Sequence, residues 1–63
     1  MKEYEDLPRE LKMKIEEICE LDPYGQLSPQ TLYGNIYHST GSYEQLSMIF
    51  EVSPSLVRAI KES

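Results

Sequence analysis

The chain has 63 residues, of which 11 are acidic and six are basic, and its formal net charge at pH 7 is -5. A chain of this length makes one small domain that buries only about 60% of its unfolded surface, so its core is small. The acidic balance argues against tight, sequence-independent binding to nucleic acid, because affinity for phosphate grows with the number of cations delivered. It favours a basic protein partner instead.

A single cysteine, Cys19, and a single histidine, His38, restrict the possible chemistry. One cysteine forms no internal disulfide, and a structural zinc site needs a Cys/His cluster that this sequence lacks. We therefore expect no cofactor, no bound metal and no catalytic residue. A lone cysteine on an apolar helix face suits a reducing cytoplasm, and residues 1–10 hold no apolar run, so we expect neither a signal peptide nor a membrane span.

The first predicted helix lies within residues 7–22. Four apolar side chains are spaced by four, four and three residues, which places them on one side of a helix: Leu7, Leu11, Ile15 and Ile18. Cys19 lies beside them, Pro8 suits the first turn, and Asp22 before a proline ends the helix. Residues 1–26 hold eight acids and four bases, a charge of -4, whereas residues 27–63 hold three acids and two bases, a charge of -1. The acidic part of the chain is therefore this first helix.

Three serines predict the starts of three further helices. Ser28 and Ser53 each precede a proline, a hydroxyl cap followed by the residue favoured at the first helical position. Ser42 is followed by Glu44 and Gln45, which can complete its cap. We expect the second helix to end at Gly41 as a C-terminal cap.

Each of these three helices has its own apolar side. Leu32 and Ile36 form the stripe of the second helix, with Tyr33 and Tyr37 adjacent at the same spacing. The inward side chains of the third and fourth helices are predicted to be Leu46, Ile49 and Phe50, and Leu56, Val57 and Ile60. No segment alternates with a period of two, so we expect no strand.

The pattern predicts an all-α fold, a small four-helix domain formed by residues 1–63 as a single unit. Residues 1–26 make an acidic N-terminal helix and turn, and residues 28–63 make a tri-helical unit. The predicted core comprises Leu11, Ile15, Ile18, Ile36, Leu46, Phe50, Val57 and Ile60.

Residues 43–61, YEQLSMIFEVSPSLVRAIK, resemble the helix-turn-helix of bacterial and phage DNA-binding proteins. The type is that of resolvase-like recombinases, small transcription regulators and terminase small subunits, and with the preceding helix it resembles a homeodomain-like tri-helical unit over roughly half the chain. Ser47 stands where the motif needs a small residue, and Val52 fills the core from the turn. Glu51 departs from the family, which usually has glycine at this position because the residue is left-handed. We therefore expect Glu51 at positive φ.

The resemblance implies that the outward face of the fourth helix reads DNA. That face would hold Pro54, Ser55, Arg58, Ala59 and Glu62. Arg58 can read guanine by two hydrogen bonds, and Ser53, Ser55 or Lys61 can hold phosphate. Two cations are few for a DNA-binding surface, so the resemblance also implies a homodimer that doubles them.

Two functions of different classes follow from these observations. The first is a small helix-turn-helix protein that binds double-stranded DNA, a phage or mobile-element transcription regulator. The alternative is an acidic protein-binding module or inhibitor, which keeps the helix-turn-helix scaffold and docks on transcription or defence machinery. It would use acidic residues of the first helix such as Glu16 and Glu20 to hold a basic protein partner.

Overall fold

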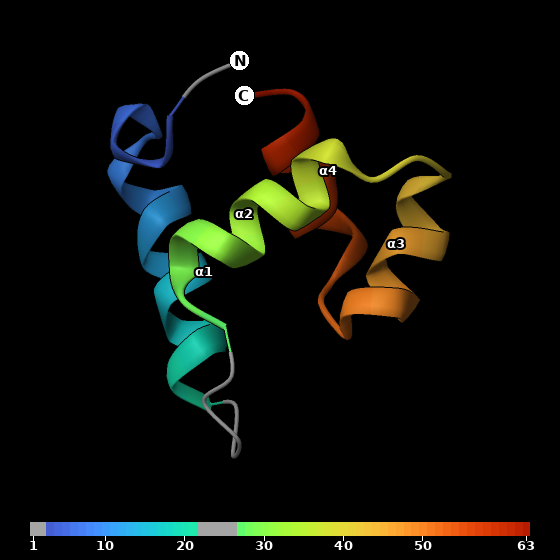
Figure 1. Cartoon of the computed structure of the whole chain (residues 1–63), viewed down its shortest axis with the longest axis horizontal. Helices are drawn as coiled ribbons and strands as arrows, with labels where there is room; N and C mark the ends of the chain where they lie inside the picture. Colours follow the sequence, from blue (N-terminus) through green and yellow to red (C-terminus); the bar gives the residue numbers. More distant parts are fainter. Residues whose placement is uncertain (1–2, 22–26) are drawn as a thin grey trace.

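The computed structural model describes residues 3–21 and 27–63, and within these ranges the chain forms helices and no strand. A short 3-10 helix, η1, precedes the four α-helices labelled in Figure 1. Their bounds are Tyr4–Asp6 for η1, Arg9–Leu21 for α1, Pro29–His38 for α2, Tyr43–Phe50 for α3 and Pro54–Lys61 for α4. The prediction of an all-α, four-helix fold is confirmed.

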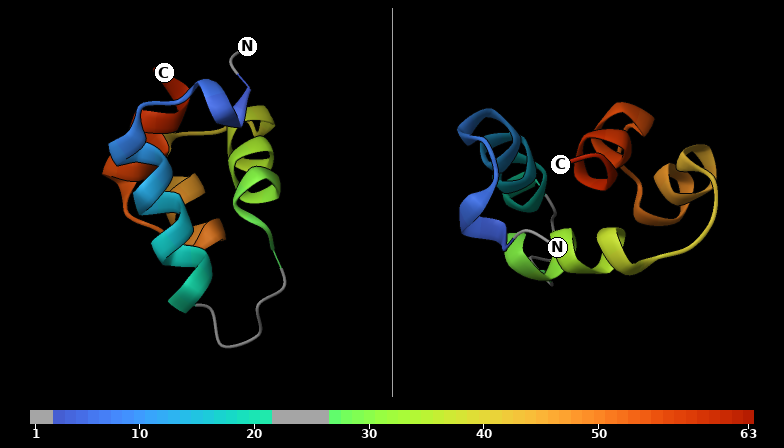
Figure 2. Two further views of the ribbon diagram at one scale, coloured as in Figure 1. Left: turned by 90° about the vertical axis from the view of Figure 1, so that its left-hand side faces the viewer. Right: turned by 90° about the horizontal axis from the view of Figure 1, so that it is seen from above.

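Helix α4 is the element on which the other helices converge. It packs against α1, α2 and α3, and Figure 2 shows it between α1 and α3 while α2 runs across. Three apolar side chains of this short helix are buried, Leu56, Val57 and Ile60. The side of α4 that faces away from these residues is exposed, which makes it a candidate for contacts with other molecules.

The helix starts lie where the serine caps predict them. The Ser28 and Ser53 hydroxyls each accept a hydrogen bond from the backbone N–H three residues further on, both at 3.2 Å. Ser42 and Gln45 form a capping box, in which each side chain accepts from the other residue's backbone N–H at 3.1 Å. Such caps satisfy N–H groups that have no partner inside the helix, and each contributes about 1 kcal/mol.

The end of α2 differs from the prediction. The helix stops at His38, and Ser39 is its C-terminal cap with extended backbone angles, whereas Gly41 lies in the following loop at a φ of 127°. Part of the reason is a contact with α4. The Lys61 ammonium donates hydrogen bonds to the carbonyl oxygens of Tyr37, at 2.8 Å, and of Ser39. These carbonyls have a partner outside the helix, so a glycine cap is not required there.

The core contains most of the predicted residues. Six of the eight are buried: Leu11, Ile15, Ile36, Leu46, Val57 and Ile60. The other two, Ile18 and Phe50, pack against this core and are partly buried. The remaining buried apolar residues are Tyr4, Leu7, Leu32, Tyr33 and Leu56.

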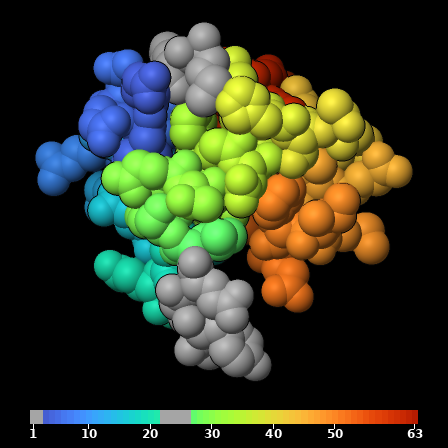
Figure 3. Space-filling view, in the orientation of Figure 1, coloured from blue at the N-terminus to red at the C-terminus, as the bar shows by residue number. Residues whose placement is uncertain are grey.

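The inward orientation predicted for Ile49 is wrong. Its exposed fraction is 69%, and that of the neighbouring Met48 is 79%. Helix α3 spans only eight residues, packs mainly against α4 and lies at one edge of the molecule, coloured orange in Figure 3. A helix held along one narrow side buries one stripe, and here the buried residues are Leu46 and Ser47.

Tyr4 is a core residue that the predicted core omitted. Its hydroxyl donates to Glu16 Oε2 at 3.2 Å and to the Lys12 carbonyl at 3.3 Å, and its ring meets Tyr33 edge-on at 6.2 Å. Burial, together with the adjacent Glu16 carboxylate, raises the pKa of Tyr4 to about 12. The spacing from Tyr4 to Leu7 continues the apolar periodicity of α1, and this is the signal that could have identified it.

Glu51 is left-handed, as the resemblance to a helix-turn-helix implies, with φ 57° and ψ 43° at the C-terminal cap of α3. Replacing Glu51 by glycine should therefore raise the free energy of unfolding by about 1 kcal/mol, because glycine adopts this conformation without a Cβ clash. Glu51 is exposed, so the substitution removes no core contact. Chemical denaturation followed by circular dichroism measures the change.

Glu44→Gly is the matched control for this substitution, since Glu44 lies in the first turn of α3 with helical geometry. Glycine there should lower the stability by up to about 1 kcal/mol. A Glu51→Gly variant less stable than the parent chain would show that the turn carries no strain.

Across the described residues, none of the helices combines the length and the apolar character needed to cross a bilayer.

Candidate nucleic-acid interface

The connection between α3 and α4 holds the candidate site in position. Only residues 51–53 separate the two helices. Ser47, 8% exposed, is the one buried polar residue in the part of the chain that the structure describes. Its hydroxyl donates to the Glu44 carbonyl at 2.7 Å, and its own carbonyl accepts from Val52 N–H at 3.0 Å. Val52 is partly buried against the core. A short, hydrogen-bonded turn of this kind allows α4 little freedom relative to α3.

The outer face of α4 consists of the five residues predicted for it. Pro54, Ser55, Arg58, Ala59 and Glu62 are all exposed. Pro54, Ser55 and Ala59 have short, uncharged side chains, and Glu62 ends in a carboxylate. Arg58 is therefore the cation of this face. The Arg58 side chain is 71% exposed and lies in the middle of the helix.

Arg58 is paired with the carboxylate one turn further along α4. Its Nε donates to Glu62 Oε2 at 2.7 Å, and the exposed fractions of the two side chains are 71% and 51%. An exposed pair at this helical spacing contributes only about 0.3–0.5 kcal/mol. The guanidinium can therefore leave Glu62 for another acceptor at small cost.

Lys61, the second predicted cation, does not belong to the outer face. It is partly buried, and its ammonium donates to the Tyr37 and Ser39 carbonyl oxygens at the end of α2. These carbonyls are the negative end of the α2 dipole, which favours a cation there. A phosphate contact by Lys61 would require breaking these hydrogen bonds.

The two serines at the start of α4 are exposed and hydrogen-bonded to each other. Their hydroxyl oxygens are 3.1 Å apart, and the Ser53 oxygen also accepts from Leu56 N–H. Ser53 is therefore occupied as the helix cap, whereas Ser55 extends the outer face of α4. Both lie at the helix end where partial positive charge accumulates, which suits an anion.

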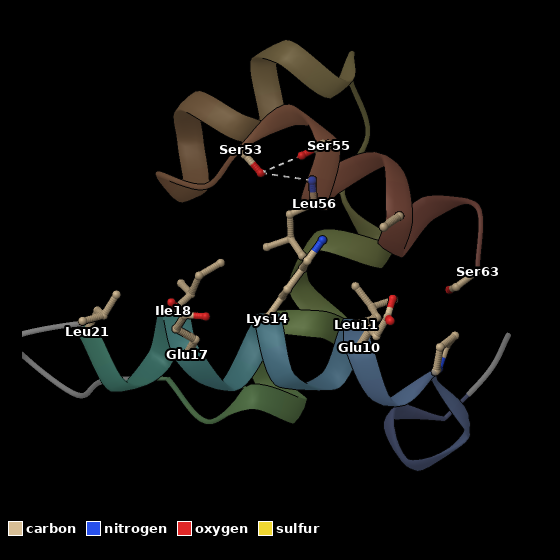
Figure 4. Close-up of a pocket in the computed structure, with 12 residues that line it drawn as sticks. Glu10, Leu11, Lys14, Glu17, Ile18, Leu21, Ser53, Ser55, Leu56 and Ser63 are labelled. Carbon is tan, nitrogen blue, oxygen red and sulfur yellow. Dashed lines mark hydrogen bonds between the residues drawn. The ribbon is translucent and has the colours of Figure 1, made fainter.

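One flank of the outer face borders a groove between α4 and α1. The groove has a volume of about 530 Å³, and Ser55 and Ala59 line it on the α4 side. Glu10, Lys14 and Glu17 line it on the α1 side, as Figure 4 shows for the labelled residues. Two carboxylates thus lie next to the outer face of α4.

Glu10 and Glu17 are not the acidic residues that the sequence analysis named as contacts for a partner. The acidic residues expected to bind a partner were Glu16 and Glu20, but Glu16 accepts the Tyr4 hydroxyl and neither lines this groove. The signal was present in the spacing, because Glu10 and Glu17 are seven residues apart and so share one side of α1. Which side faces α4 depended on the packing of the two helices.

Cys19 and His38 belong to the scaffold. Cys19 is partly buried against the core, and His38 ends α2 with its ring edge-on to Tyr37 at 5.4 Å. Within residues 3–21 and 27–63, no three His, Cys, Asp or Glu side chains are grouped so that they could hold a metal ion.

Comparison of the chain with protein-family models, with curated proteins and with solved structures finds no match.

Proposed function

We propose that the chain is a small DNA-binding protein, a transcription regulator of the phage or mobile-element type. In this proposal α3, the turn and α4 act as a helix-turn-helix, and α4 enters the major groove. The observation that carries the proposal is the outer side of α4, which is exposed along its length and presents short side chains around one guanidinium, that of Arg58. An α-helix fits the major groove, which is about 12 Å wide.

Arg58 is the group that would read sequence. A guanidinium can donate two hydrogen bonds to the O6 and N7 atoms of guanine, the commonest specific contact in the major groove. Arg58 would exchange its exposed bond to Glu62 for these acceptors.

The affinity expected from this surface is low. Lys61 is engaged at the end of α2, and Glu10 and Glu17 flank the outer face through the groove. Each phosphate contact contributes to the slope of affinity against salt concentration, so one exposed cation on the outer face of each α4 predicts a shallow slope.

Arg58→Ala is the substitution that tests the proposal. It should lower specific DNA affinity by about 1–3 kcal/mol and relax the preference for guanine at one position of the site. Selection from a random duplex library identifies the site, and a salt titration of binding measures the affinity of each variant. Glu62→Gln is the matched control: it removes the partner of Arg58 and keeps the cation, so binding should be retained or strengthened. Equal binding by the parent chain and Arg58→Ala would refute a reading role for α4.

The proposal also predicts that the chain binds DNA as a homodimer. A dimer supplies a second Arg58, and its two α4 helices would lie about 34 Å apart to meet successive major grooves. Sedimentation velocity with and without the selected duplex measures the stoichiometry. A monomer under both conditions at high concentration would count against the regulator function.

A further inference from the structure

The groove between α1 and α4 has a shape that suits a linear occupant. Its α1 side extends from Pro8 to Leu21 and its α4 side from Ser53 to Ser63. At 1.5 Å per helical residue, thirteen residues of α1 correspond to roughly 20 Å, or three to four turns of an occupant helix.

Apolar side chains alternate with charged and hydroxyl groups in the lining of the groove. Leu11, Ile18 and Leu56 contribute apolar side chains from both helices, and Leu21, which is 74% exposed, stands at one end in Figure 4. Covering the exposed Leu21 side chain would contribute about 25 cal/mol for each Å² of apolar surface removed from water. Ala59, on the α4 side, is small enough to let a backbone approach closely.

The charges of the two walls differ. The α4 wall has no charged residue, whereas α1 contributes Glu10 and Glu17 with Lys14 between them, a net charge of -1. The two carboxylates are seven residues apart, two helical turns or roughly 10 Å along α1. A partner that matches this wall carries two cations at the same separation.

We propose that this groove binds an amphipathic helix of a basic partner protein, with an apolar stripe on Ile18, Leu21 and Ala59. Two lysine or arginine residues spaced i, i+7 on the partner would face Glu10 and Glu17. Helix-in-groove binding of this kind uses anchors at i, i+3, i+4 and i+7 on the bound helix. The inference goes beyond DNA binding and does not depend on it.

The same observations disfavour two other occupants. A second copy of this chain has a net charge of -5 and would bring an acidic molecule to the acidic α1 wall. A nucleic acid would place its phosphates beside Glu10 and Glu17. Because Ser55 and Ala59 belong both to the groove and to the outer face of α4, a bound helix would also cover part of the surface proposed to read DNA.

Two designed peptides test the proposal directly on the full chain without DNA. Each has about 18 residues and one leucine stripe. One peptide carries lysines spaced i, i+7 along the flank of the stripe, and the other carries glutamates at those positions. Fluorescence anisotropy should show binding of the basic peptide and binding of the acidic peptide at least about tenfold weaker. Amide chemical shifts should change along α1 and α4.

Substitutions on each wall complete the test. The double substitution of Glu10→Lys and Glu17→Lys should weaken binding of the basic peptide by about tenfold or more. The control, Glu5→Lys with Glu44→Lys, makes the same change in net charge outside the groove and should alter binding of the basic peptide little. Ala59→Phe fills the groove from an exposed position and should also abolish binding without unfolding the chain, as a thermal melt would verify. The proposal would be overturned if the basic peptide failed to bind or if both peptides bound equally. Equal losses of binding in the two charge-reversed variants, or chemical-shift changes confined to α3, would also overturn it. A DNA titration of the same samples reports separately on the regulator function.

Discussion

Replacing Ile36 by alanine is expected to remove about half of the protein's stability or more. Ile36 has an exposed fraction of 0% and lies on α2, which packs against α1, α4 and η1. Removing a buried isoleucine side chain to the β-carbon costs about 2–5 kcal/mol, through lost burial and the cavity left behind. A domain of this size has a total stability of only about 3–9 kcal/mol, at 0.05–0.15 kcal/mol per residue. Thermal and urea melts followed by circular dichroism measure the loss.

Ile49→Ala provides the matched control, because it makes the same chemical change at a residue that is 69% exposed. Its effect on the free energy of unfolding should stay within about 0.5 kcal/mol. Phe50→Ala should fall between the two, since Phe50 is partly buried against the core. Equal losses for Ile36→Ala and Ile49→Ala would mean that α3 buries its other side.

Lys61→Met is expected to destabilise the chain by about 1–2 kcal/mol, although a charged residue near the end of a helix is usually replaced at little cost. The reason is that its ammonium donates to two carbonyl oxygens at the end of α2, one of them at 2.8 Å, and so links helices that are distant in sequence. Methionine keeps the length of the side chain and removes only the hydrogen bonds and the charge. Urea denaturation measures the change in stability.

Arg58→Met is the control for Lys61→Met, because both remove a cation from α4. The exposed pair of Arg58 with Glu62 predicts a loss no greater than about 0.5 kcal/mol. In DNA binding the larger effect should come from Arg58→Met, which should weaken the complex. Lys61→Met should leave the salt dependence of DNA binding unchanged. Unchanged stability with weaker DNA binding for Lys61→Met would mean that the ammonium points outward and meets phosphate.

Features set within one helical turn could be predicted from the sequence. The serine caps before α2, α3 and α4 and the buried stripes of α1, α2 and α4 all depend on residues a few positions apart. The left-handed conformation of Glu51 was instead expected from the resemblance of residues 43–61 to a helix-turn-helix. Hydroxyl caps, proline at the first helical position and apolar residues three or four apart act through local hydrogen bonds and local geometry. The exposed face of α4, with Arg58 at its centre, follows from the same periodicity.

Features that depend on which helices meet were decided by the tertiary structure. Ile49 is exposed because α3 packs mainly on one neighbour, and α2 ends at His38, where Lys61 of α4 reaches its last carbonyls. The groove that brings Glu10 and Glu17 beside α4 exists because α1 and α4 pack together on α2. Apolar spacing specifies that one side of a helix is buried. Which helix that side packs against, and at what angle, depends on the surfaces of all the helices together.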